Sequence, residues 1–199
     1  MKVTAIKQQV KNPERVSIFV DEKYEFSLSL DELVRYGLKN GAELDKADVK
    51  KYKKISEDGK LRARSLEWLL NRPHSTREFK DYLYRKKADA DLGQKLIDEF
   101  TKKGYLDDAK FASWFIELQG RRNKSHRAIR AELLKKGISG EILDNVLEAE
   151  PIDEQQSLKE LIDKKRRLSR YKNDELKLKQ YLTRQGFSYS DVNEALKDD

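Results

Sequence analysis

The chain has 199 residues, of which 40% are charged and only 37% hydrophobic, so its composition excludes one thick hydrophobic core and favours several small modules. The 43 basic and 36 acidic residues leave a net charge of +7, which is compatible with an anionic partner but does not identify it. Cysteine is absent, which excludes disulfides, thiolate zinc sites and cysteine nucleophiles.

Residues 1–57 are predicted to be a β-rich extension with covering helices. Val16–Val20 and Tyr24–Leu28 are strand-like runs on either side of the short turn Asp21–Lys23, and Val3–Val10 is a candidate partner strand. An antiparallel sheet of this size is too small to be stable without a cover.

Helices are expected to supply that cover. Ser29 and Glu32 have the spacing of a capping box, which predicts a helix start, and the apolar residues between Leu44 and Ile55 indicate a second helix. Ser56–Gly59, with the sequence SEDG, is predicted to be a turn that ends this region.

The remainder of the chain is predicted to be helical and contains an internal repeat. Residues 128–147 match residues 177–196 at an offset of 49, and residues 78–97 match residues 128–147 at an offset of 50. A helix with apolar residues three and four apart precedes each of these segments, so each unit has three helices. We predict three units, at residues 58–105, 106–150 and 151–199.

The predicted fold class is therefore mainly α, with three tandem three-helix repeats in an elongated, curved array, preceded by a small antiparallel β-rich region. Capping residues support this division of the chain. Ser75 with Glu78, Ser125 and Asn173 are cap candidates at the starts of the second helices.

Glycines mark the predicted helix ends. Gly104, Gly137 and Gly186 each follow a helical run, where a residue in the left-handed conformation is commonly glycine. In the first unit, Lys87 occupies the position equivalent to Gly137 and Gly186.

Two adjacent carboxylates, Asp107 and Asp108, are the first candidates for catalysis. They stand just before the first helix of the second unit, as Asp58 and Asp153 stand before the first helices of the other two. Carboxylates at this recurring place accept hydrogen bonds from free N–H groups and meet the positive end of the helix dipole. We therefore interpret them as helix caps rather than as a catalytic or metal-binding pair, and expect no enzyme activity.

Other chemical motifs are incomplete. The two histidines, His74 and His126, lie in loops between first and second helices and are expected to face solvent, with phosphate contact as the alternative. Asp89–Gly93 resembles the opening of a calcium loop, but its glycine is misplaced and Phe100 stands where a glutamate is required. The pair Gly59–Lys60 lacks the rest of a phosphate-binding loop, so we expect neither ATP hydrolysis nor a cofactor.

The remaining candidates are runs of lysine and arginine around the junction of the first and second helices in each unit. A single run is commonly a solvated helix face, but stacked units could line the runs into a basic stripe that neutralises phosphates. The candidate binding residues are Arg72, Arg77, Arg85, Lys86, Lys87, Arg121, Arg122, Lys124, Arg127, Arg130, Lys164, Lys165, Arg166, Arg167 and Arg170.

Several of these segments together resemble one known family. The segments Arg72–Leu83, Gly104–Phe115, Ala128–Ser139 and Gln180–Leu196 look like the RecX family of recombination regulators. The segment Asn12–Leu44 is similar to the extension found on many members, so the resemblance covers nearly the whole chain.

The resemblance implies a regulator of homologous recombination, DNA repair and the SOS response that has no catalytic residues. It implies binding to the filament that the RecA recombinase forms on single-stranded DNA, along the filament groove. Inhibition of ATP hydrolysis, strand exchange and co-protease activity is then expected. Single-stranded DNA and, in addition, double-stranded DNA are the expected nucleic-acid partners. The start lacks the apolar region of a signal peptide and no apolar run reaches membrane-spanning length, so we expect a cytoplasmic monomer.

Two other functions fit part of the pattern. Three short helices also form helix-turn-helix units, so independent DNA binding is the alternative function. Against it, third helices such as Gly140–Glu150 are acidic or apolar where groove-reading helices are basic. A nuclease that uses Asp107 and Asp108 is the least favoured of the three.

Overall fold

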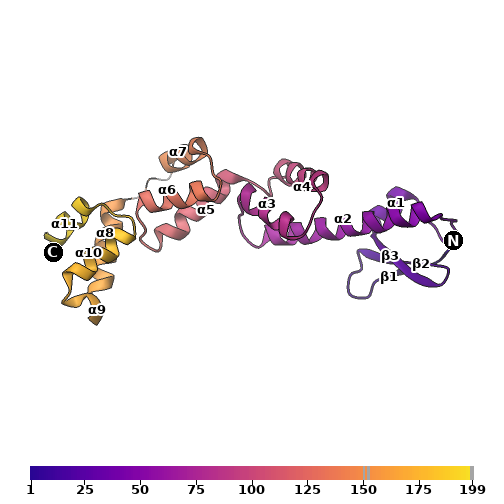
Figure 1. Cartoon of the computed structure of the whole chain (residues 1–199), viewed down its shortest axis with the longest axis horizontal. Coiled ribbons are helices and arrows are strands. Elements are labelled where there is room, and N and C mark those ends of the chain that lie inside the picture. The colour runs from indigo at the N-terminus through magenta and orange to yellow at the C-terminus, as the bar shows by residue number, and fades with distance from the viewer. Residues whose placement is uncertain (150, 152, 198–199) are drawn as a thin grey trace. The chain divides into compact units, whose positions relative to one another are not determined.

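The structure, a computed structural model, describes residues 1–149, 151 and 153–197 (Figure 1). Among these residues a small sheet is followed by helices only. In chain order the elements are β1 (Val3–Gln8), β2 (Arg15–Val20), β3 (Lys23–Ser29), α1 (Leu30–Tyr36), α2 (Lys46–Leu70), α3 (Thr76–Arg85), α4 (Ala90–Lys102), α5 (Asp108–Gly120), α6 (His126–Lys135), α7 (Gly140–Ala149), α8 (Glu154–Arg166), α9 (Ser169–Lys172), α10 (Glu175–Arg184) and α11 (Tyr189–Lys197).

The chain divides into two compact units. The first comprises residues 1–71 and 86–96, and the second comprises residues 72–85 and the chain from residue 97 onward. No helix in the described ranges combines the length and the apolar character that a membrane span requires.

The sheet of the first unit is antiparallel with the order β1-β2-β3, as predicted. Alternate residues of β2 are buried, and Ile18 pairs with Ile6 on one side and with Phe26 on the other. Asp21 and Glu22 make the turn between β2 and β3 with positive φ angles of 45° and 69°, the conformation that a tight hairpin requires. The inner face of the sheet packs against residues of α1 and α2 in one core.

The helix α2 contradicts one prediction. Residues Ser56–Gly59 do not form a turn, because α2 runs through them without interruption for 25 residues. Ser56 is buried on the face toward the sheet, and the pair Lys54–Asp58, four residues apart, supports the helix at this point. Asp58 is therefore not a helix cap, and the predicted boundary after residue 57 lies inside a continuous helix.

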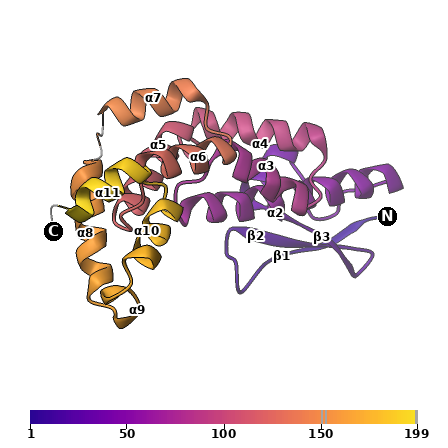
Figure 2. The same cartoon turned by 60° about the vertical axis from the view of Figure 1, so that its left-hand side comes forward.

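The second unit contains two complete sets of three helices. The helices α5, α6 and α7 pack around Phe111, Phe115, Leu133 and Leu143, and α8, α10 and α11 enclose a separate core that includes Phe187 (Figure 1 and Figure 2). The mainly α fold with tandem three-helix units after a small antiparallel sheet is confirmed. The short helix α9 is an addition that the repeat did not predict.

The helix caps follow the repeat with one correction. Ser75 and Ser125 accept hydrogen bonds from the backbone N–H groups of Glu78 and Ala128, at 3.1 and 3.2 Å. Asn173 is not the corresponding cap, because Asp174 accepts the bond from the N–H group of Lys177. An aspartate satisfies the free N–H groups as well as an asparagine does, so chemistry alone does not distinguish the two positions.

The predicted helix ends at Gly104, Gly137 and Gly186 have positive φ angles of 71°, 84° and 101°. Lys87, which the repeat aligns with Gly137 and Gly186, also has a positive φ, of 57°. The repeat therefore fixes the backbone conformation at this position even where the residue is not glycine.

Candidate functional site

The adjacent carboxylates Asp107 and Asp108 both serve helix starts. Asp107 accepts hydrogen bonds from the N–H groups of Ala109 and Lys110, at 3.0 and 3.1 Å, and so caps α5. Asp108 accepts from the N–H group of Thr76 at 2.7 Å, and so caps α3, which lies 32 residues earlier in the chain. The capping interpretation is confirmed, and Asp108 additionally ties α5 to α3. Within the described ranges, no group of three or more metal-ligating side chains could hold a metal ion.

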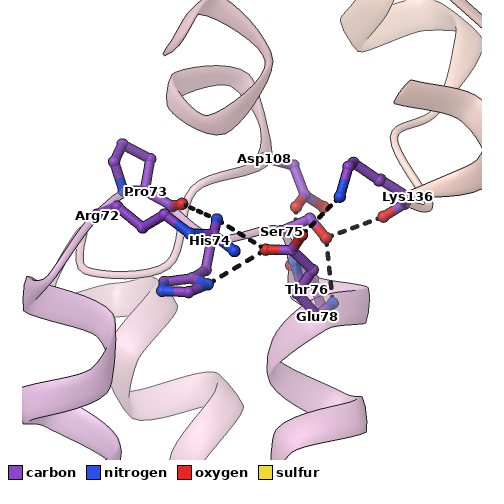
Figure 3. Close-up of polar contacts among 8 residues, drawn as sticks. All are labelled: Arg72, Pro73, His74, Ser75, Thr76, Glu78, Asp108 and Lys136. Carbon is purple, nitrogen blue, oxygen red and sulfur yellow. Dashed lines mark hydrogen bonds and ion pairs between the residues drawn. The ribbon is translucent and has the colours of Figure 1, made fainter. Parts of the chain in front are cut away.

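Asp108 belongs to a polar cluster where the start of α3 meets the end of α6 (Figure 3). We call the contact of Ser75, Glu78, Lys136 and Gly137 the first junction. The Ser75 hydroxyl donates to the carbonyl oxygen of Lys136 at 2.9 Å, which satisfies a carbonyl left free at the end of α6. Gly137 lies so close to Arg77 that an added Cβ would be 2.8 Å from the Arg77 Cβ.

Glu78 is the centre of this cluster. Its carboxylate accepts from Lys136 Nζ at 2.8 Å and from Arg72 Nη1 at 3.0 Å, and it lies 3.2 Å from His74 Nδ1 (Figure 3). Burial raises the pKa of Glu78, but the hydrogen bonds from Lys136 and Arg72 together outweigh it and hold this pKa below its usual value. The expectation that His74 faces solvent is wrong, since its side chain is only 4% exposed.

Aromatic rings of α5 cover the two cations of the first junction. The Arg72 guanidinium lies 5.2 Å from the centre of the Trp114 ring, and Lys136 Nζ lies 5.4 Å from that of Phe115. Cations so placed gain attraction from the ring faces as well as from Glu78. Both side chains are therefore committed to holding successive three-helix units together.

The second junction is built at the equivalent positions Ser125, Ala128, Gln185 and Gly186. The backbone N–H group of Ser125 donates to the carbonyl oxygen of Gln185 at 3.3 Å. An added Cβ on Gly186 would collide with Ser125 Oγ and would lie 2.7 Å from the Ala128 Cβ. Because alanine replaces the glutamate here, the second junction has no acid where Glu78 stands in the first.

Many of the predicted binding cations have partners inside the fold. Arg72 and Lys124 pair with Glu78 and Glu132, while Arg130 pairs with Asp144. The others with a partner are Arg85 on the Asp81 carbonyl, Arg121 with Glu117, Lys165 over the Tyr181 ring, Arg170 over the Tyr171 ring, and Lys86 and Arg166, which also interact with other residues.

Six of the predicted cations are exposed, and their side chains form no hydrogen bond or ion pair with any residue that the structure describes. We call them the unpaired cations: Arg77, Lys87, Arg122, Arg127, Lys164 and Arg167. Arg122 is the repeat equivalent of Arg72, and it lacks a partner because Ala128 stands where Arg72 finds Glu78. Arg77 and Arg127 are also equivalent to one another, each at the second residue of its helix.

Two residues of the first junction were not predicted from the sequence to join the units. Glu78 was expected only as a cap residue, and Lys136 was not selected, because their ion pair joins positions 58 residues apart. The repeat alignment does contain one signal, since the glutamate at position 78 corresponds to an alanine at position 128. A charge that occurs in one unit only indicates a contact specific to that unit.

Three family models match the sequence. Residues 1–45 match the "Regulatory protein RecX N-terminal domain", residues 107–147 match "RecX, second three-helix domain", and residues 153–196 match "RecX, third three-helix domain". These ranges fall on the sheet with α1, on α5 to α7, and on α8 to α11.

Curated relatives agree with these matches. A "Regulatory protein RecX" of Bacillus pumilus (strain SAFR-032) is 33% identical over 202 residues, which cover 98% of this chain and 76% of the relative. Another, of Listeria innocua serovar 6a, is 34% identical over 149 residues, 74% of this chain and 55% of the relative. The chain thus spans about three quarters of the former and about half of the latter.

Solved structures extend the likeness to the fold. A "Crystal structure of regulatory protein RecX" matches with a TM-score of 0.72 and 26% identity over 100% of this chain and 99% of that one. A "Crystal structure of RecX from Lactobacillus salivarius" matches in fold, with a TM-score of 0.58 and 22% identity over 71% of this chain and 96% of that one. On the family models and the Bacillus relative, the chain belongs to the RecX family of regulatory proteins.

Proposed function

We propose that the protein is a non-enzymatic regulator of homologous recombination. It binds the filament of a RecA-type recombinase on single-stranded DNA, along the filament groove, and inhibits the ATPase, strand-exchange and co-protease activities of that filament. Family membership supports the regulatory role, because the relatives are named regulatory proteins. The recombinase as partner is what the resemblance of the sequence to the family implies.

The observation that supports a binding surface most directly is the placement of Arg77 and Arg127. Both lie in the first turn of a helix, where the positive end of the dipole disfavours a cation by about 0.3–1 kcal/mol. Both are exposed and unpaired among the described residues. The fold gains nothing from a positive charge there, whereas an anionic partner would.

The unpaired cations suit a partner that presents phosphates or carboxylates along its length. Arg122 and Arg127 lie on either side of the Ser125 cap, and Lys164 and Arg167 follow at the end of α8. Such exposed cations attract nucleic acid mainly through the phosphates and select little by base. Binding to the DNA-containing filament is therefore expected to weaken as salt rises.

Independent DNA binding through helix-turn-helix units is the second candidate. It is favoured by the three-helix units themselves. The helix α7, however, has three acids, Glu141, Asp144 and Glu148, and no lysine or arginine. A groove-reading third helix needs the opposite charge, so we place this candidate second.

The test adds purified protein to recombinase filaments on single-stranded DNA and follows ATP hydrolysis. We expect inhibition at well below one protein per recombinase protomer, because one protein in the groove affects several protomers. Binding to naked DNA, measured in the same buffer, is the control for independent DNA binding. DNA integrity after incubation is the control for nuclease activity. Unchanged ATPase activity and filament length would contradict the proposal.

A further inference from the structure

A pocket of about 260 Å³ lies in the first compact unit, between the middle of α2 and the loop that leads into α4. No side chain in its lining is aromatic, and lysines and arginines outnumber acids. The lining residues are Lys54, Glu57, Asp58, Lys60, Leu61, Arg64, Lys86, Lys87, Ala88, Asp89 and Leu92.

Two of the three acids of this pocket already have partners. Lys54 Nζ binds Asp58 at 2.9 Å and Asp89 at 2.5 Å, and Asp89 also accepts from the N–H group of Leu92 at 2.8 Å. The pKa of Lys54 is raised well above its usual range, by the hydrogen bond to Asp89 first and by that to Asp58 second. Both carboxylates are thus engaged by Lys54, and the five cations of the lining still outnumber its three acids.

Three cations remain without a partner at the pocket wall. Lys60, Arg64 and Lys87 form no side-chain hydrogen bond or ion pair with the residues that the structure describes. Glu57 is the only other acid in the lining, and its side chain is likewise unpaired within that part of the chain. With five cations against three acids the lining has an excess of positive charge, which an anion in the cavity would balance.

Lys87 adds an independent observation. Its φ of 57° lies in the left-handed region, which strains any residue with a Cβ. The equivalent positions in the other two units are Gly137 and Gly186, so glycine satisfies this backbone without strain elsewhere in the same chain. A lysine in this strained conformation beside a cationic cavity fits a functional use of its charge.

We propose that this pocket binds a phosphate group of the single-stranded nucleic-acid backbone. Lys60, Arg64 and Lys87 neutralise the phosphate, and the lack of an aromatic wall leaves the base without a stacking partner, so recognition is of the backbone alone. The inference rests on the proposed function, because it adds a DNA contact between α2 and the loop before α4 to the proposed binding of the DNA-containing filament. The unpaired cations Arg77, Arg122 and Arg127 are not part of the pocket.

The experiment measures binding of a fluorescent oligothymidylate by anisotropy over a range of salt concentrations. Lys60→Gln, Arg64→Gln and Lys87→Gln are each expected to weaken binding about three- to tenfold at low salt, and to reduce the slope of log affinity against log salt by about 0.7. Lys51→Gln removes an exposed lysine from the same helix outside the pocket, and should leave both quantities unchanged. Wild-type binding by all three pocket variants would overturn the proposal.

Lys87→Gly separates the pocket from a merely structural role. It removes the charge and the backbone strain together, so DNA binding should fall as in Lys87→Gln while the unfolding temperature rises by about 2–4 °C. Inorganic pyrophosphate is tested as a competitor of the oligothymidylate. If the variants weaken the binding of pyrophosphate but leave DNA binding unchanged, the pocket takes a small anion and not DNA, which also overturns the proposal. Inhibition of the recombinase ATPase is measured separately. If the wild-type protein inhibits the filament but the pocket variants bind DNA as tightly as the wild type, the pocket proposal is contradicted and the proposed function is not.

Discussion

The two junctions of the second compact unit occupy equivalent positions but use different chemistry. The first contains a charged cluster in which Glu78 joins Arg72 and Lys136. At the second, the small side chains of Ser125 and Ala128 face Gly186. Both share a serine cap, a carbonyl acceptor at the end of the next second helix, and a left-handed glycine.

Some residues of a junction belong to the repeat, and others occur at one junction only. Serine and glycine set the spacing of the helices, and so they recur. The residue at position 78 or 128 decides whether the neighbouring arginine is used inside the fold. Arg72 is bound by a glutamate and stabilises the first junction, whereas Arg122 faces an alanine and remains available to a partner.

The largest effect on the free energy of unfolding is expected at the two junction glycines, where an added Cβ has no room. Gly186→Ala places a Cβ against Ser125, the Ala128 Cβ and the Ala128 backbone in a conformation that alanine rarely adopts, and should cost about 3 kcal/mol. Gly137→Ala has the side chain of Arg77 as its nearest neighbour and should cost about 2 kcal/mol. Urea unfolding measures both. Gly140→Ala, which meets nothing within 4 Å, is the control and should be neutral or slightly stabilising. Equal, small costs at all three glycines would mean that the junctions are not closely packed.

The charged cluster predicts an effect that is confined to the first junction. Glu78→Gln leaves Arg72 and Lys136 without their shared acid and should destabilise the protein by about 1–2 kcal/mol. Glu132→Gln, at the more exposed pair with Lys124, should cost less than about 1 kcal/mol. A double-mutant cycle with Lys136→Gln isolates the coupling, and a coupling energy of zero would show that the cluster does not hold the junction.

The pH dependence of stability also distinguishes the first junction, which has a half-buried acid, from the second. Because the pKa of Glu78 is lower in the folded protein than the usual 4.5, its stabilising contribution is fully present above pH 4.5 and is lost as pH falls through the folded value. Thermal unfolding of the wild type and of Glu78→Gln should therefore differ most near neutral pH and converge below pH about 4.5. A difference that grows toward acid pH would mean that Glu78 is ionised less readily in the folded state.

The smallest effect is expected at the adjacent aspartates. Asparagine at positions 107 and 108 can still accept the hydrogen bonds of Ala109 and Thr76, so Asp107→Asn with Asp108→Asn should cost less than about 1 kcal/mol and leave filament inhibition intact. Replacement of both by alanine removes the caps and should cost about 1 kcal/mol each. Loss of inhibition in the folded asparagine variant would return these carboxylates to consideration as functional groups.

Much of this architecture could be predicted because it is local and repeated. The strands follow from alternation, and the left-handed glycines follow from their place after an apolar helical run. The cap of α10 was predicted one residue early, although the repeat offset of 49 aligns Asp174 with Ser125. The turn at Ser56–Gly59 was predicted from residue types that favour turns, but burial of Ser56 against the sheet extended the helix through them.

The candidate site was less predictable, because which cations are available to a partner depends in part on contacts between residues far apart in the sequence. The list of candidate cations contains both Arg72 and Arg122, and composition treats them alike. Glu78, six residues after Arg72, distinguishes the structural arginine from the available one, since alanine stands at the equivalent position 128. The use of this glutamate between units depends on Lys136, 58 residues away. Similarly, nothing local indicates that Lys136 lies over the rings of Phe111 and Phe115.

The most direct test of the central claim, that the unpaired cations bind the filament, compares two triple variants. Arg77→Glu, Arg122→Glu and Arg127→Glu together reverse three unpaired cations, and Lys39→Glu, Lys46→Glu and Lys50→Glu make the same change in net charge at other exposed positions. Both variants should retain wild-type helix content by circular dichroism. If the unpaired cations bind the filament, only the first variant loses inhibition of the recombinase ATPase, and this is the result that we expect. Full inhibition by the first variant, or equal loss in both, would contradict it.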